Sequence, residues 1–243
     1  MSTGLVKDAT IFANNTGNSN GAGPGMFVGS NSGPSARRGF VRVDVASYSS
    51  GILVGKTIDA VRLILTVGMK AGSGGGDGGG GGSCTGGDGT SRTIDIFRVI
   101  DVSGTSTGDW GESATTSAGS SIGGTGQGAT AGAGDATWAS RAHSSAWASA
   151  GASSDYNTTA SDTQSTGTTC PVQITFSGTN MVSDVTGWLN GSFPNRGWIL
   201  KSQAEGSSQS FRAFWTKEGE LLGYTIGSPA ITHYGPVLEI DYH

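Results

Sequence analysis

The feature that most restricts the fold of this chain is a run of nearly pure glycine, Gly72 to Gly89, between two segments with strand-like patterns. Glycine loses more backbone freedom on folding than any other residue and has no side chain to bury. Residues 71–91 are therefore predicted to be a loop inserted between two strands, ordered only where other structure packs against it. The hydrophobic core has to come from the segments on either side.

A second stretch, residues 103–170, also lacks sustained periodicity and is dominated by Ala, Ser, Thr and Gly. Its aromatic residues stand alone, which is typical of a long surface excursion held down at a few hydrophobic points. We expect residues 1–243 to form a single β-sandwich domain in which 71–91 and 103–170 are insertions.

The remaining segments alternate apolar and polar residues with the period of a β-strand. They are residues 9–13, 25–29, 38–45, 57–67, 93–100, 172–176, 196–201, 210–215 and 236–242. In the strongest of them, Ile58 and Ala60 are expected to point inward and, after a change of register, so are Leu63, Leu65 and Val67.

One segment has a helical period instead: residues 180–190, in which Met181, Val185, Trp188 and Leu189 share a face. Many short strands and one short helix predict an all-β protein, an antiparallel jelly-roll-like β-sandwich.

Charge and hydropathy exclude several classes of partner. Charged residues make up 13% of the chain against a usual ~25%, and the net charge of -4 includes no long acidic or basic run. We therefore expect no nucleic-acid or membrane partner. No window approaches the ~18 apolar residues of a membrane helix, and no signal peptide is visible. A surface rich in Ser, Thr, Asn and Gly favours an extracellular or virion-surface location.

The two cysteines, Cys84 and Cys170, lie in the two loop-like regions. A disulfide between them would close 170 − 84 = 86 residues, a constraint worth ~4–5 kcal/mol in the chain-entropy model. Two free thiols are the alternative, and spacing alone does not decide between them.

Catalytic motifs are missing from the sequence. His143, His233 and His243 stand far apart, and no zinc spacing, nucleophile elbow, phosphate loop or EF-hand loop occurs. The chain is therefore predicted not to be an enzyme. The candidate contact residues are the aromatic residues of the excursion: Trp110, Trp138, Trp147 and Tyr156. Their rings could stack on a sugar or on a partner surface. The alternative is that they anchor the excursion to the sandwich.

Several motifs in order resemble those of the DNRLRE domains, disaggregatase-related β-sandwiches allied to carbohydrate-binding modules. The matching stretches are residues 8–11, 37–45, 58–67, 134–138, 182–191, 195–200, 216–218 and 236–242. The resemblance implies a non-catalytic sandwich of bacterial, archaeal or phage surface proteins, sometimes binding polysaccharide. The glycine run departs from the family pattern.

The resemblance also implies a metal hypothesis, because related sandwiches often hold a calcium ion where the first and last strands meet. Asp8 and Asp241 are then candidate oxygen ligands. The alternative is that both are ordinary strand-end carboxylates. No other cofactor is expected.

These observations together predict a non-catalytic external structural protein: a phage virion component such as a head-decoration, tail or fibre-associated subunit. It would act by assembly, as a homo-oligomer or with other virion subunits, and by adhesion. The alternative is a secreted carbohydrate-binding module whose partner is a polysaccharide.

Overall fold

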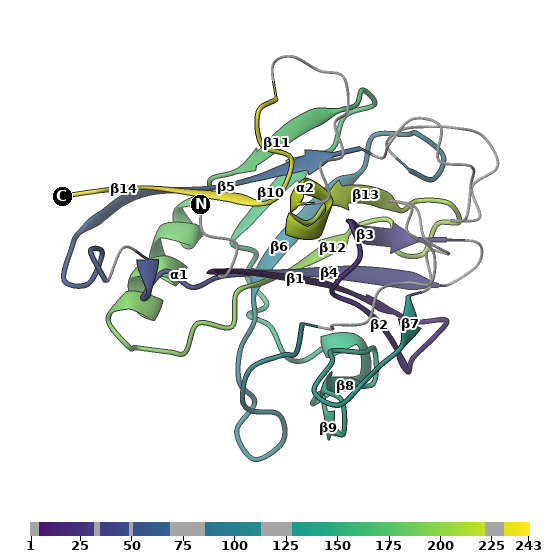
Figure 1. Ribbon diagram of the computed structural model, residues 1–243, viewed down its shortest axis with the longest axis horizontal. Helices are drawn as coiled ribbons and strands as arrows, with labels where there is room; N and C mark the ends of the chain where they lie inside the picture. Colours follow the sequence, from purple (N-terminus) through teal and green to yellow (C-terminus); the bar gives the residue numbers. More distant parts are fainter. Residues whose placement is uncertain (1–4, 32–34, 49–50, 69–85, 113–127, 222–230) are drawn as a thin grey trace.

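The computed structural model describes residues 5–31, 35–48, 51–68, 86–112, 128–221 and 231–243. Within these ranges the chain is mostly β, with antiparallel strands and a few short helices (Figure 1). The strands are β1 (Val6–Phe12), β2 (Asn18–Asn20), β3 (Gly25–Ser30), β4 (Ala36–Val43), β5 (Ile58–Val67), β6 (Thr93–Arg98), β7 (Ala129–Thr130), β8 (Ser140–Ala142), β9 (Ser145–Ala146), β10 (Asp162–Ser165), β11 (Val172–Phe176), β12 (Trp198–Ser202), β13 (Arg212–Trp215) and β14 (Val237–Tyr242). The helices are α1 (Thr179–Leu189), α2 (Lys217–Leu221) and the 3-10 turn η3 (Ala150–Ala152).

The strands form two antiparallel layers that share β3. One layer runs β10-β6-β12-β4-β1, and the other contains β3, β13, β5, β11 and β14. Met26 to Val28 pair with β13, whereas Gly29 and Ser30 pair with β4. The crossing needs glycine, because Gly29 has φ +121° and a Cβ there would lie 2.7 Å from the backbone of Phe211.

The main core lies between the two layers. Val41 and Val43 of β4 face Leu63 and Leu65 of β5 in one buried cluster, as the alternating pattern predicts. Helix α1 adds Met181, Val185 and Trp188 to this cluster, and the Trp188 ring centre lies 4.6 Å from that of Trp198. The strands and the helix therefore bury the residues that their periodicity marks as apolar faces.

The predicted change of register in residues 57–67 is confirmed. Asp241 pairs with Ala60, but its neighbour Tyr242 pairs with Ile58, so Asp59 is bulged out of the ladder. Ile58, Leu63, Leu65 and Val67 are buried in the core, as expected. The inward direction expected for Ala60 is wrong: its neighbour Val61 is the core residue and Ala60 is half-buried, because the bulge at Asp59 shifts the alternation by one residue.

Each segment expected to be a strand contains one, and α1 lies where a helix was expected. The second helix, α2, and the short strands β2, β7, β8, β9 and β10 were not expected from the sequence. Four of these strands lie in the 103–170 excursion, and β10 pairs with β6 at the edge of a layer. Its sequence, Asp-Thr-Gln-Ser, has no apolar alternation to reveal it.

Neither helix in the described ranges is long and apolar enough to span a membrane. Of the expected glycine loop, residues 71–85 lie outside the described residues, and residues 86–91 are described.

Candidate functional site

The four aromatic residues named as contact candidates gather on the outer face of the layer that contains β1, β4 and β12. There they join Phe40 and Ile199 in a second buried group, the aromatic cluster. Its members are Ala9, Ile11, Phe40, Val99, Trp110, Ala136, Trp147, Ala152 and Ile199, with Phe97, Trp138 and Tyr156 packed against them. The described parts of the excursion, residues 103–112 and 128–170, therefore cover the face that Phe40 presents away from the main core, and residues 113–127 lie outside the described residues.

Trp110 and Trp147 are buried, with 0% and 4% of their surface exposed. The Phe40 ring centre lies 5.4 Å from both, and the indole N–H groups donate to the carbonyls of Arg196 and Thr137, at 2.7 and 2.8 Å. Both indoles thus fasten the excursion to the sheet, and in this arrangement neither presents a face to a ligand.

Trp138 and Tyr156 are half-buried. The Arg38 guanidinium lies 4.9 Å from the Trp138 ring centre, and Lys201 Nζ lies 4.6 Å from the Tyr156 ring centre and donates to its hydroxyl. Tyr156 also lines a shallow cavity of about 570 Å³ with Arg98, Ile100, Ser153, Ser154, Asn157 and Thr158. Tyr156 thus borders a cavity that also presents hydroxyl and amide groups.

A group of acidic residues lies at the other face of β1. Asp8 is opposite Val41 in the β1–β4 ladder, so its side chain takes the core-facing side, while Lys7 and Ala9 point outward. Asp8 is completely buried. Glu112 comes from the start of the excursion and accepts a hydrogen bond from the Asp8 backbone N–H at 2.9 Å.

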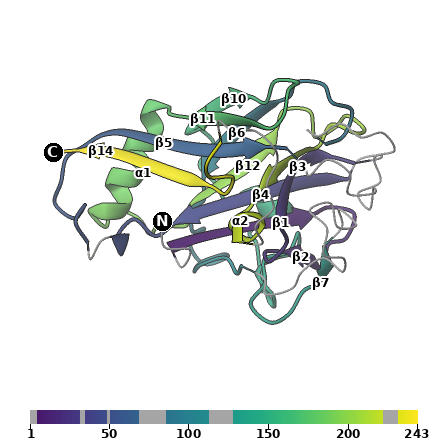
Figure 2. The ribbon, with the colours of Figure 1, turned by 45° about the horizontal axis from the view of Figure 1, so that its top comes forward.

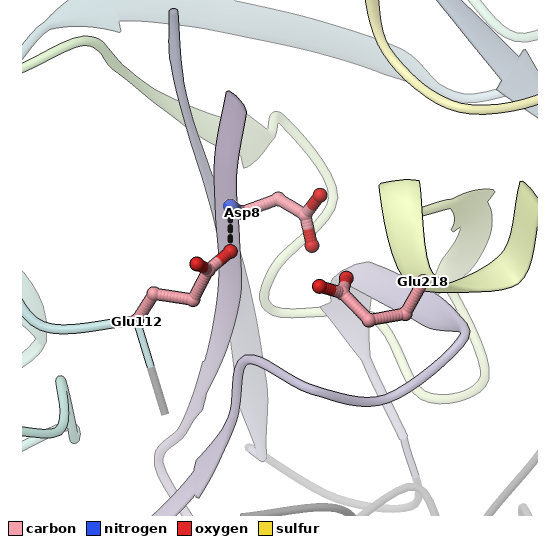
Figure 3. Close-up of side chains that lie close together, drawn as sticks. All are labelled: Asp8, Glu112 and Glu218. Carbon is pink, nitrogen blue, oxygen red and sulfur yellow. Dashed lines mark hydrogen bonds between the residues drawn. The ribbon is translucent and has the colours of Figure 1, made fainter. Parts of the chain in front are cut away.

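The third member is Glu218 of α2, a helix that lies beside β1 (Figure 2). Asp8, Glu112 and Glu218, here called the carboxylate cluster, each place an oxygen within 4.8 Å of the others. Figure 3 shows the Asp8 and Glu218 carboxylates pointing toward each other. Three chain segments that are far apart in sequence thus converge on one group of oxygen donors.

Lys217 supplies the positive charge that the structure places in this cluster. Its Nζ contacts Glu112 and lies 2.9 Å from Glu218, and its backbone N–H donates to Asp8 Oδ2 at 3.1 Å. Asp8 Oδ1 and Glu218 Oε2 are buried and have no hydrogen-bond partner within the described part of the chain. With all four groups ionised the cluster carries a net charge of about −2, since each carboxylate contributes −1 and the ammonium +1.

The pKa shifts agree with this excess of negative charge. Burial, followed by the charge of Glu218, raises the pKa of Asp8 well above its usual value. Burial also raises the pKa of Glu218, against the influence of Lys217. Burial alone would lower the pKa of Lys217, but the neighbouring carboxylates outweigh it and raise that pKa. The cluster therefore favours an additional cation or a proton.

Asp241, the other predicted calcium ligand, lies elsewhere. It is exposed on β14, a strand that pairs with β5, and its carboxylate lies 2.8 Å from Arg62. Among the described residues, the carboxylate group around Asp8 contains Glu112 and Glu218 and not Asp241. No sequence pattern marked Glu112, and Glu218 appeared only within the 216–218 stretch of the family resemblance, not as a ligand. Each lies more than 100 residues from Asp8, so their proximity leaves no local signal.

Cys170 is disulfide-bonded. Cys84, the other cysteine of the chain, lies outside the described residues.

One end of the molecule presents an apolar surface, which the sequence analysis did not identify. Leu5, Val43, Val45, Tyr48, Leu53 and residues 238–242 line a groove of about 500 Å³. The large hydrophobic side chains exposed in the described ranges are Tyr48, Ile52, Val54 and Tyr242. We call these four residues and the groove the apolar end. Figure 1 shows residues 44–48 and 51–57 and the end of β14 at the same side, on the left.

No family model matches the sequence, and no curated protein matches it. The aromatic cluster, the carboxylate cluster and the apolar end are therefore the features from which function can be inferred.

Proposed function

We propose that this protein is a non-catalytic external structural protein of a phage virion, a head-decoration, tail or fibre-associated subunit that acts by assembly and adhesion. The observation that supports this proposal most strongly is the apolar end. Val54 is 59% exposed and Ile52 46% exposed beside a groove with a largely aliphatic lining. Exposed apolar patches of this kind mark protein contacts, because burying them against a partner removes apolar surface from water.

The contact is proposed to use this side-chain surface and not strand pairing. β14 pairs with β5 on one side, and Glu239 and Asp241 on β14 are exposed and lie near Arg62. Charged side chains along a strand edge oppose the addition of an identical strand. Two copies, or a copy and another virion subunit, would instead meet through Ile52, Val54 and the groove.

Other observations support the same function. The scaffold is proposed to be a jelly-roll-like sandwich of the DNRLRE kind, a type found in surface proteins. Only 13% of the residues are charged, and several arginines are buried, so the surface is rich in hydroxyl and amide groups. The aromatic cluster holds the excursion in a fixed shape, which suits a subunit that has to present one surface repeatedly.

The assembly test uses an Ile52→Lys/Val54→Lys double variant. Light scattering after size exclusion should show concentration-dependent assembly of the wild-type protein and a monomeric variant with an unchanged melting temperature. A Ser207→Lys/Ser208→Lys variant, at exposed positions between β12 and β13, controls for added charge and should assemble normally. Equal assembly of both variants would exclude the apolar end as the contact.

A secreted carbohydrate-binding module is the second candidate, and the cavity at Tyr156 favours it. An aromatic ring beside Ser153, Asn157 and Arg98 combines an apolar surface with hydrogen-bonding groups, which is how proteins bind sugars. A Tyr156→Ser variant should then lose glycan binding in calorimetry while assembly remains unchanged. Absence of binding to a broad panel of polysaccharides by the wild-type protein would exclude this candidate.

A further inference from the structure

Asp8 occupies a position at which a charge is costly. It is completely buried, on the core-facing side of β1 between Val6 and Thr10. An unpaired ionised carboxylate in such a place costs several kcal/mol, so proteins pair it, protonate it or use it to bind a cation. Among the described residues, Asp8 Oδ2 accepts one hydrogen bond, from the backbone N–H of Lys217, and Asp8 Oδ1 has no partner.

The unpartnered oxygen belongs to a group that could hold an ion. Figure 3 shows the Asp8 carboxylate between β1 and α2, directed toward Glu218. Glu218 Oε2 is also buried and has no partner among the residues that the structure describes, and the cluster oxygens lie within 4.8 Å of one another. Oxygens that bind one Ca²⁺ at 2.3–2.6 Å lie at about this separation or closer.

We propose that Asp8, Glu112 and Glu218 form a Ca²⁺ site that joins β1, the start of the excursion and α2. The donors are all carboxylates, without His or Cys, which favours a hard cation over zinc. Mono- and bidentate carboxylates with water complete the 6–8 oxygens that Ca²⁺ takes. This site does not depend on the proposed virion function.

The single positive charge of Lys217 does not neutralise the three carboxylates. Its Nζ contacts Glu112 and Glu218, but its single charge leaves a net charge of about −2. Lys7, next to Asp8 on β1, and Arg42, opposite Lys7 on β4, pair with Asp109 on the outer face of the sheet. A divalent cation would balance the cluster, with Asp8 Oδ1 and Glu218 Oε2 as its first two ligands.

The experiment compares the full chain after treatment with EDTA and dialysis, with and without CaCl₂. At a calcium concentration 100-fold above Kd, the melting temperature should rise by about 5–10 °C. Tb³⁺ should give luminescence on excitation of tryptophan, because Trp215 lies against Gly219 of α2, and excess Ca²⁺ should quench it. The same rise with an equal concentration of Mg²⁺ would overturn the assignment to calcium.

Variants locate the site. Asp8→Asn and Glu218→Gln keep the side-chain size and should each abolish both the melting shift and the Tb³⁺ signal. Asp241→Asn, which removes the ligand that the sequence alone suggested, should leave both unchanged. Glu218 lies on a short helix outside the main core, so its variant tests the site even if Asp8→Asn does not fold. No calcium response in the folded wild-type protein, or a response kept in Glu218→Gln, would overturn the proposal.

Discussion

At the scale of single residues, buried arginines fix loops to the sheets of this weakly charged chain. Arg212 of β13 is fully buried. Its guanidinium donates to the Gly86 carbonyl at 3.0 Å, to Asp88 at 2.7 Å and to the carbonyl of Thr90. Residues 86–90, which end the glycine-rich stretch, are therefore held by a side chain from a strand more than 120 positions away.

The ionisation of Asp88 makes the stability of the fold depend on pH. Burial acts to raise its pKa, but hydrogen bonds from Arg212, the Thr90 N–H and Arg92 outweigh this, and the pKa is lowered. A lowered native pKa means that ionised Asp88 stabilises the fold above its unfolded pKa of about 3.9, and that this contribution is lost as the pH falls through the native pKa.

Asp88 is exposed, so solvent screening limits the effect: Asp88→Asn should reduce the free energy of unfolding at pH 7 by about 0.5–1 kcal/mol, and the deficit should shrink below about pH 4. Urea denaturation at pH 7 and pH 3 measures this. Glu239→Gln, at an exposed position of β14, should have a small effect at both values. A deficit for Asp88→Asn that is independent of pH would contradict the role given to its charge.

At the scale of elements, the excursion behaves as a third layer over the sheet. Trp147 packs in parallel on Phe40, with an interplanar angle of 11°, and Arg141, also buried, lies 5.4 Å from the Trp147 ring centre and 2.9 Å from Asp101. Aromatic burial and paired arginines thus replace the alternating pattern that the segment lacks.

Trp147→Ala should lower the free energy of unfolding by about 3–5 kcal/mol, because it opens a large cavity over Phe40. Trp138→Ala, at a half-buried position, should cost less. Urea denaturation and limited proteolysis, with cleavage sought in residues 128–170, provide the measurements. Unchanged stability of Trp147→Ala would show that the excursion is not anchored through this residue.

At the scale of the whole molecule, two sheets and their insertions are tied together by contacts between distant parts of the chain. The sequence hypothesis of a Cys84–Cys170 bridge predicts that reductant lowers the free energy of unfolding by up to ~4–5 kcal/mol. Urea denaturation with and without reductant tests it. A Cys84→Ser/Cys170→Ser variant should resemble the reduced protein and should not respond to reductant. A wild-type protein that is equally stable in both conditions would contradict the estimate.

The sequence by itself determined the strands and the helix that bury one face, because burial of alternate or helically spaced residues leaves a local pattern, as in 57–67 and 180–190. It could not reveal β10, which is polar, or α2, which is short. Only the tertiary structure placed Glu112 and Glu218 beside Asp8, buried Trp110 and Trp147, and brought Tyr48 and Tyr242 to one groove. The physical reason is that periodicity reports which way a side chain points, whereas the neighbours it meets depend on how segments far apart in the chain pack together.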